Sequence, residues 1–201
     1  MEKEKIVEAG YDKIAKEYHA TRDIFKHKKE IKKFISLLPN KAKILDVGCG
    51  AGVPIARNLV NVGFDVVGID LSKRMLKLAR KNVSQAKFMK KDMTKVDFKN
   101  NSFDGLTAFY SIIHVPREKH TSIFQSFHRI LKPNGVMLVS MGSEKWEGTS
   151  KDFHGAKMFW SHYSPKKSLR IIKDAGFEII FDKHIINGGE KHYWILAKNK
   201  K

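Results

Sequence analysis

Apolar residues along this chain follow two different spacings, and the change between them predicts an alternation of helices and strands. Near the start, apolar residues recur every three or four positions, which is typical of helices that bury one face, at residues 4–19 and from Asp23 to about Leu38. Further along, short runs of apolar and β-branched residues predict buried strands. The predicted strands are 42–47, 64–69, 86–90, 103–109, 136–141, 177–186 and 191–198, and the later predicted helices are 54–62, 73–83, 117–131 and 164–175.

The order of these elements predicts the fold. Strands that alternate with helices form a parallel sheet with helices on both faces, because each crossover brings the chain back in the same direction. Asn187-Gly188-Gly189 joins the last two strands as a hairpin turn, so one strand near that edge is reversed. We therefore expect an α/β, doubly wound, three-layer fold with a seven-stranded, mostly parallel sheet and one antiparallel edge strand.

We expect residues 1–201 to form a single domain in which residues 1–40 are N-terminal helices that cap the sheet. Residues 142–163 have no clear period and contain several aromatic residues among many polar ones. We interpret this segment as an excursion that contacts a substrate, since segments placed at the edge of a rigid scaffold commonly carry binding residues. The alternative is a loop that only packs over the edge of the sheet.

Residues 44–52, with the sequence ILDVGCGAG, are the most informative stretch of the chain. A buried strand ends here and breaks into glycines at alternate positions, Gly48, Gly50 and Gly52, before a helix begins. Glycines at such a turn allow a sharp bend and let a ligand approach where a Cβ atom would block it. A strand, a glycine turn and a helix therefore predict a ligand-binding unit.

Acidic residues follow the next two strands. Asp70 ends the second strand, where a carboxylate can accept both hydroxyls of a ribose, and Asp92 and Met93 follow the third strand. The carboxyl ends of adjacent parallel strands meet at the crevice where open α/β sheets bind ligands. The dinucleotide fingerprint has one residue more before its third glycine, so the spacing here argues against an NAD-dependent oxidoreductase.

Five motifs in order resemble those of class I S-adenosylmethionine-dependent methyltransferases. The likeness is to the small-molecule type, related to the ubiquinone-biosynthesis enzymes, and covers about residues 8–141. It implies the Rossmann-like methyltransferase fold, with S-adenosylmethionine as cofactor and S-adenosylhomocysteine as product. The motifs are ILDVGCGAG at 44–52, VVGIDLS at 66–72, KKDMTKVDF at 90–98, SFDGLTAFYSIIHVPR at 102–117 and RILKPNGVMLVS at 129–140.

The resemblance implies roles for residues near the methionine portion of the cofactor. Gly48, Gly50 and Gly52 would admit this portion, with the Gly48 carbonyl facing its ammonium group. Asp46 would orient the same portion, and Phe109 would line its side. A purely structural role for Asp46, tying down the glycine turn, is the alternative.

The resemblance also implies roles around the nucleoside. Asp70 would bind the ribose hydroxyls, and Leu71 would pack on the adenine. Asp92 would accept a hydrogen bond from the adenine amine while the Met93 N–H reaches the ring. Tyr18, in the segment YDKIAKEY that is similar to the family's lid helix, would close over the cofactor. Met93 can equally be a core residue, since methionine fills gaps readily, and Tyr18 can be a half-buried helix residue.

Histidines are the candidate bases on the acceptor side. Methyl transfer from a sulfonium releases a neutral thioether, so a base matters only where the acceptor arrives protonated. His114 follows the fourth strand and is expected at the crevice, and His154 and His162 lie among aromatic residues of the excursion. For His120 and His192 we favour a packing role. Asp152, His154 and His162 match no standard metal-site spacing, so we expect no metal site.

Composition adds one question. The chain has 201 residues with 42% hydrophobic content and a net charge of +18. The single cysteine, Cys49, the absence of an apolar run long enough to span a membrane, and the lack of a secretory leader predict a cytoplasmic protein. The charge could serve a polyanionic partner, but its spread along the chain favours solvated lysines.

These observations predict an enzyme that transfers a methyl group from S-adenosylmethionine to a small-molecule acceptor. An RNA-directed methyltransferase is an alternative because of the positive charge, although AFYSIIH at 108–114 lacks the double proline typical of base-amine methylases. A cofactor-binding protein without catalysis is the second alternative.

Overall fold

The computed structural model describes residues 3–21 and 28–201, and it confirms the predicted sheet. Seven strands lie in the order β3-β2-β1-β4-β5-β9-β8, and β9 runs antiparallel to both of its neighbours. The strands of this sheet are β1 Lys43–Val47, β2 Asp65–Asp70, β3 Lys87–Lys90, β4 Phe103–Ala108, β5 Leu131–Gly142, β8 Phe177–Asn187 and β9 Glu190–Asn199. The helices are α1 Lys3–Thr21, α2 Lys28–Ile35, α3 Ile55–Asn61, α4 Lys73–Asn82, α5 His120–Ile130 and α6 Pro165–Asp174, with short 3-10 turns η2 Met93–Lys95, η3 Ile112–His114 and η4 Arg117–Lys119.

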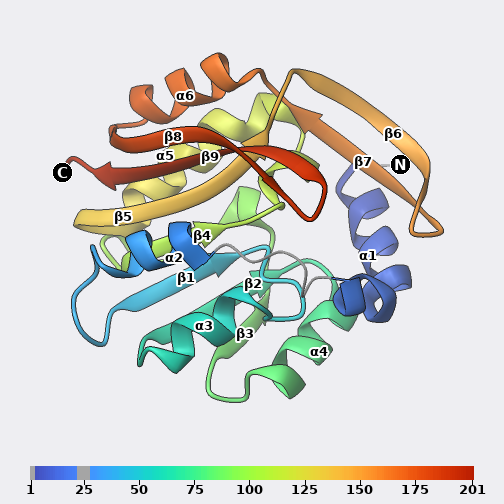
Figure 1. Cartoon of the computed structure of the whole chain (residues 1–201), viewed down its shortest axis with the longest axis horizontal. Coiled ribbons are helices and arrows are strands. Elements are labelled where there is room, and N and C mark those ends of the chain that lie inside the picture. The colour runs from blue at the N-terminus through green and yellow to red at the C-terminus, as the bar shows by residue number, and fades with distance from the viewer. Residues whose placement is uncertain (1–2, 22–27) are drawn as a thin grey trace.

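Helices cover both faces of the sheet, as the alternation of elements predicts (Figure 1). Side chains alternate along each strand, so Ile44 packs under α2 and α3 while its neighbour Leu45 packs under α5. On β5, Leu138 likewise packs in the same core as Ile44, and its neighbour Val139 packs in the same core as Leu45. The two faces therefore hold two separate apolar cores, which fix the carboxyl ends of the parallel strands at one edge.

Several element ends differ from the sequence prediction. Asp23, expected to begin the second helix, lies outside the described residues. The helix expected from 117 starts at His120, after one 3-10 turn. β5 already begins at Leu131, which pairs with Phe103, so the expected turn at 134–135 lies within an irregular part of the strand.

Residues 142–163 form a β-hairpin rather than an irregular excursion. Its strands are β6 Trp146–Phe153 and β7 Ala156–His162, which pair with each other in a sheet of their own. Figure 1 shows this hairpin beside α1, away from the main sheet. β7 packs on α1, whereas β6 has no buried residue, so β6 lacks the apolar alternation that would have predicted a strand.

α1 is held against the rest of the molecule by specific contacts at its middle. Asp12 accepts hydrogen bonds from the Ser72 hydroxyl at 2.6 Å and the Arg74 N–H at 3.1 Å, at the start of α4. The carboxylate is well placed there, because the first turn of a helix carries unpaired N–H groups. Gly10 lies against β7 so closely that a Cβ atom would come within 2.8 Å of the Lys157 carbonyl oxygen.

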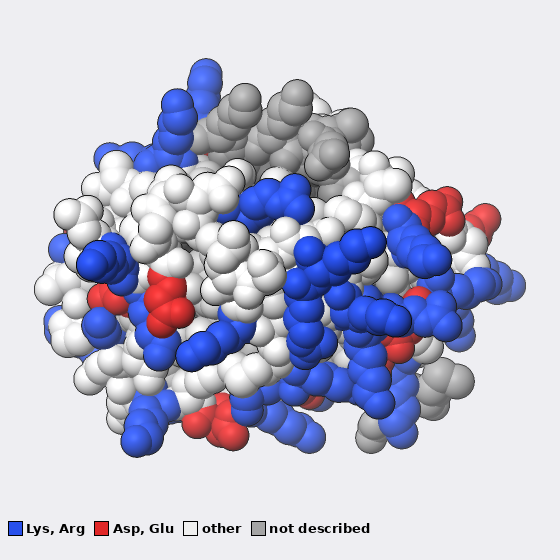
Figure 2. Space-filling model, turned by 90° about the horizontal axis from the view of Figure 1, so that it is seen from below, with Lys and Arg blue, Asp and Glu red and all other residues white. Residues whose placement is uncertain are grey.

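Basic side chains are unevenly distributed over the surface. Figure 2 shows many of them gathered on the face that includes α4. α4 carries Lys73, Arg74, Lys77, Arg80 and Lys81, and no acidic residue. Among the described residues, no helix is long and apolar enough to cross a membrane.

The close contact at Gly10 predicts the sign of a mutational effect. In an open helix, Gly→Ala stabilises by up to about 1 kcal/mol. Here Gly10→Ala should destabilise the protein instead, because the added methyl group meets the backbone of β7. Urea unfolding measures the effect, and the control is Ala9→Gly on the exposed side of α1, which should cost about 1 kcal/mol from helix propensity alone. A Gly10→Ala protein more stable than wild type would contradict the contact.

Candidate functional site

The glycine turn after β1 is fixed by its neighbours on both sides. The N–H groups of Gly48 and Cys49 both donate to the Ile69 carbonyl at the end of β2, at 2.8 and 3.0 Å. Gly48 has a φ of 68°, and a Cβ atom there would lie 2.2 Å from the Cβ of Ser111. Glycine is therefore required at 48 for both backbone conformation and space.

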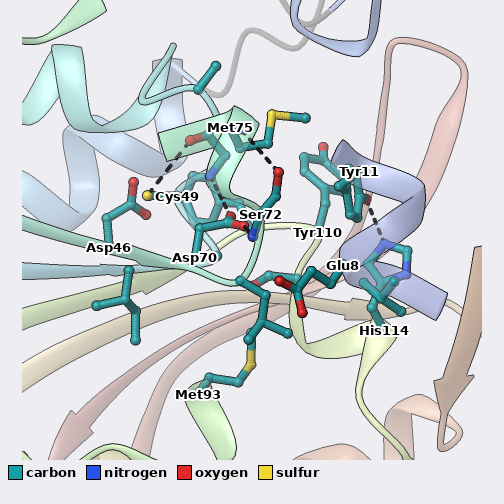
Figure 3. A pocket seen from close by; sticks show the side chains of 18 of the residues that line it. Glu8, Tyr11, Asp46, Cys49, Asp70, Ser72, Met75, Met93, Tyr110 and His114 are labelled. Atoms are coloured by element: carbon teal, nitrogen blue, oxygen red, sulfur yellow. Dashed lines mark hydrogen bonds between the residues drawn. The ribbon is translucent and has the colours of Figure 1, made fainter. Parts of the chain in front are cut away.

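Gly50 presents bare backbone to a cavity. Its φ is 51°, and a Cβ atom there would find no other atom within 4 Å. The Gly50 N–H donates to Asp70 Oδ2 at 2.9 Å, while the Ser72 N–H donates to Asp70 Oδ1 at 2.8 Å (Figure 3). Burial raises the pKa of Asp70, and these backbone donors oppose the rise. A carboxylate offers about four acceptor sites, so Asp70 can still accept hydroxyl groups.

Asp46 is the most unusual group in this region. Its side chain is buried, with Oδ1 accepting from the Thr107 hydroxyl at 2.8 Å. No described residue bonds to Oδ2, although this atom is also buried. Burial raises the pKa of Asp46 to about 7, against the weaker opposing effect of the Thr107 hydrogen bond. A buried acceptor with no partner fits a site that a donor or cation on a ligand completes.

The structure brings most of the expected cofactor residues together around one cavity, which we call the glycine cavity. It measures about 1210 Å³ out to its open mouth. The expected residues that line it are Tyr18, Asp46, Gly48, Gly50, Asp70, Leu71, Asp92, Met93 and Phe109. Gly52 lies away from it, where a Cβ atom would come 3.2 Å from both Val83 and Phe88.

Asp92 and Met93 both have structural contacts in addition to their place in the cavity wall. Asp92 Oδ1 accepts from the Thr94 N–H at 2.8 Å and so caps η2. Met93 packs against the apolar core beneath α5. The two roles that the sequence left open for Met93, core residue and cavity wall, are therefore compatible in space.

Tyr11, the first residue of the segment YDKIAKEY, is a site residue for which the sequence predicted no role of its own. Its hydroxyl lies 2.8 Å from His114 Nε2, and His114 Nδ1 lies 2.7 Å from the Phe159 carbonyl oxygen (Figure 3). A carbonyl can only accept, so we assign the proton to Nδ1 and a hydrogen bond from the tyrosine hydroxyl to Nε2. Burial lowers the pKa of His114 to about 4, so the ring is neutral near pH 7. The seven-residue spacing from Tyr11 to Tyr18, two turns of one helix face, was the available signal.

A second cavity adjoins the glycine cavity, and we call it the aromatic cavity. The two share Tyr11, Tyr18, Tyr110 and His114 in their walls. The other rings around it come from the hairpin and from the β9 end: Trp146, Phe153, Trp160, His162 and His192.

The three candidate bases therefore occupy different positions. His114 lies between the cavities, and His162 lines the aromatic cavity. His154 is at the hairpin tip, where its ring contacts those of Tyr18 and Phe153 but is absent from both cavity walls. The geometry separates the histidines that the sequence could not distinguish.

Known proteins share these motifs. A family model described as a methyltransferase domain matches residues 44–135. A Bacillus subtilis (strain 168) protein named as a methyltransferase, YqeM, is 36% identical over 152 residues, which are 70% of this chain and 61% of that protein. These comparisons support a class I S-adenosylmethionine-dependent methyltransferase.

Two further comparisons describe relatives of this chain. Phosphoethanolamine N-methyltransferase 3 of Arabidopsis thaliana is 32% identical over 155 residues, which are 73% of this chain and 31% of the plant protein. A solved S-adenosylmethionine-dependent methyltransferase of Methanosarcina mazei has a TM-score of 0.74 at 21% identity, covering 84% of this chain and 97% of that one. The last comparison establishes the likeness of fold. The chain spans less than two thirds of the length of both curated relatives.

The buried Asp46 predicts how the stability of the protein depends on pH. The pKa of Asp46 is about 7 in the folded chain, against an ordinary value of 3.8, so the folded state keeps a proton that the unfolded state releases. The contribution of Asp46 to the free energy of unfolding should therefore fall as pH rises from about 4 to about 7, by at most about 4 kcal/mol.

Urea unfolding of Asp46→Asn across that pH range checks the prediction. The variant should lack this part of the pH dependence and gain stability relative to wild type as pH rises. Asp65→Asn, at the exposed start of β2, is the matched control and should follow wild type. Parallel pH curves for wild type and Asp46→Asn would contradict the assignment.

Proposed function

We propose that the chain transfers a methyl group from S-adenosylmethionine to a small-molecule acceptor by in-line displacement, leaving S-adenosylhomocysteine. The observation that carries the proposal is the pair of adjoining cavities. The glycine cavity is bordered by the bare backbone of Gly50 and by the carboxyl groups of Asp46 and Asp70. The aromatic cavity is lined by aromatic rings. A donor site and an acceptor site that share a wall are what direct transfer between two bound molecules requires.

The residues of the glycine cavity fit the cofactor at its methionine end. The open space beside Gly50 admits a ligand, and the unpartnered Oδ2 of Asp46 suits its ammonium group, either directly or through water. We assign the Gly48 carbonyl to the same ammonium and Phe109 to the side of the methionine chain. The cofactor supplies an activated methyl group on a sulfonium, and these residues hold and orient that end.

At the nucleoside end, we assign Asp70 to the ribose hydroxyls, Leu71 to the adenine face and Asp92 to the adenine amine. Asp70 suits this role because its two oxygens are already aimed by the Gly50 and Ser72 N–H groups. We assign the Met93 N–H to the adenine ring and Tyr18 to closure over the cofactor. Tyr18 stands in the walls of both cavities, which suits a residue that covers one ligand and faces the other.

The small-molecule acceptor is supported by the aromatic cavity and by the relatives. Aromatic and apolar side chains with polar groups placed among them are typical of small-molecule sites. The plant relative is named for a small molecule, phosphoethanolamine. An RNA acceptor is the competing function, and the basic face of α4 in Figure 2 is the observation that favours it.

A transfer assay with labelled donor separates these functions. The protein is incubated with methyl-labelled S-adenosylmethionine and a panel of phenols, amines, thiols and carbon acids, and separately with total RNA. We expect label in the small-molecule fraction. Label in RNA alone would favour the competing function, and binding of S-adenosylhomocysteine with no transfer to either would indicate a binding protein without catalysis.

The assignment of Asp70 predicts a loss of cofactor affinity. Asp70→Asn removes the charge and one acceptor, so affinity for S-adenosylhomocysteine in calorimetry should fall by about 10-fold or more. NADH should bind neither protein. Asp65→Asn, five residues earlier on the same strand, should bind like wild type. Equal affinities for wild type and Asp70→Asn would remove Asp70 from the cofactor site.

A further inference from the structure

His162 is held in one orientation at the end of β7. Its Nδ1 lies 2.5 Å from the Glu144 carbonyl oxygen, which precedes β6. On one side the ring packs against Gly142, where a Cβ atom would lie 2.0 Å from Nδ1. Glycine at 142 therefore makes the space that the imidazole occupies.

These contacts leave one nitrogen of His162 available. The Glu144 carbonyl can only accept, so Nδ1 carries the proton and Nε2 carries a lone pair. No described residue forms a hydrogen bond with Nε2. His114 differs, because both of its nitrogens already have partners. Of these two histidines on the wall of the aromatic cavity, His162 is the one with a nitrogen open to a ligand.

We propose that His162 Nε2 receives the proton that the acceptor loses on methylation, and that the acceptor is an O–H or N–H nucleophile on a flat, uncharged body. This rests on the proposed function. The acceptor heteroatom forms a bond to the methyl carbon as the carbon–sulfur bond breaks. The sulfur keeps that electron pair as a neutral thioether, and the acceptor proton moves to Nε2. Atoms and charge balance, since the positive charge of the sulfonium ends on the imidazolium.

The surroundings of His162 suit a neutral base. Burial lowers the pKa of His162, while the Glu144 carbonyl, the Glu144 carboxylate and the backbone of Tyr163 oppose this fall. Arg117 lowers the pKa further. His114 and His120 also interact with His162, and burial lowers the pKa of each to about 4, so both stay neutral near pH 7.

The walls of the aromatic cavity indicate the body of the acceptor. Trp160, Phe153 and Tyr110 offer ring surfaces, which suit a flat apolar molecule. Lys191 is the one lysine or arginine among the described residues of this wall, whereas Glu144 and Glu190 are acidic. In a chain with a net charge of +18, this balance disfavours a phosphate or carboxylate on the acceptor.

Nuclear magnetic resonance tests the state of His162 without turnover. In the nitrogen-15 labelled protein with S-adenosylhomocysteine, His162 should be the Nδ1–H tautomer with an unprotonated Nε2 near neutral pH. Addition of catechol should shift the Nε2 resonance, and the shift should be absent with dimethyl sulfide, which has no proton to donate. A protonated Nε2, or no response to catechol, would overturn the proposal.

Transfer assays then compare wild type with His162→Asn, whose amide can still donate to the Glu144 carbonyl. With catechol or aniline, kcat should fall ~10²–10⁴-fold with little change in KM, and the acidic limb of the pH profile should disappear. Transfer to dimethyl sulfide, which has no proton to lose, should fall much less than transfer to catechol. His184→Asn, on β8 and outside both cavity walls, is the control and should match wild type.

The outcomes separate this proposal from the function beneath it. Equal catechol turnover in wild type and His162→Asn would overturn the role of His162 while leaving methyl transfer intact. Preference for phosphoethanolamine over catechol would overturn the uncharged acceptor. Failure of every acceptor in the panel would count against the proposed function itself, and the resonance measurements would still decide whether Nε2 faces a protic ligand.

Discussion

The carboxylate of Asp70 is the interaction on which the site depends. It accepts one N–H from the glycine turn and one from the start of α4, so a single side chain joins the ends of β1 and β2 to the next helix. The Ile69 carbonyl adds two more bonds to the same turn. Together these bonds orient the glycine turn, and the bare backbone at Gly50 is left with open space beside it.

Much of this arrangement could be predicted from local sequence. The strands β1, β2 and β4 are buried on both faces, so their continuous apolar runs predicted buried strands. Ser72 accepts from the Met75 N–H as a helix cap should. The glycine turn follows β1, and Asp70 is the last residue of β2. The carboxyl ends of adjacent parallel strands meet at one edge of the sheet, so the sequence predicted that the turn and Asp70 lie close together.

The rest depends on contacts between distant parts of the chain. β6 has polar and exposed residues on both faces, so its sequence lacks the alternation of apolar and polar residues that predicts a strand paired with β7. Tyr11 and His114 are 103 positions apart, and their hydrogen bond follows from the docking of α1 on the hairpin. Nor could composition show that no described residue bonds to Asp46 Oδ2, because burial of a single atom is set by packing.

The position of α1 has a thermodynamic consequence. The helix supplies Tyr11 and Tyr18 to the walls of both cavities, and Asp12 fastens it to α4. A ligand in either cavity that binds only to the docked helix also stabilises the docked helix for the other ligand. Linkage requires this effect to be reciprocal, so a donor and an acceptor that both need the docked helix would raise the affinity of each other by the same factor. Under the proposed function, one helix could thereby couple the two ligands without any second conformation of the sheet.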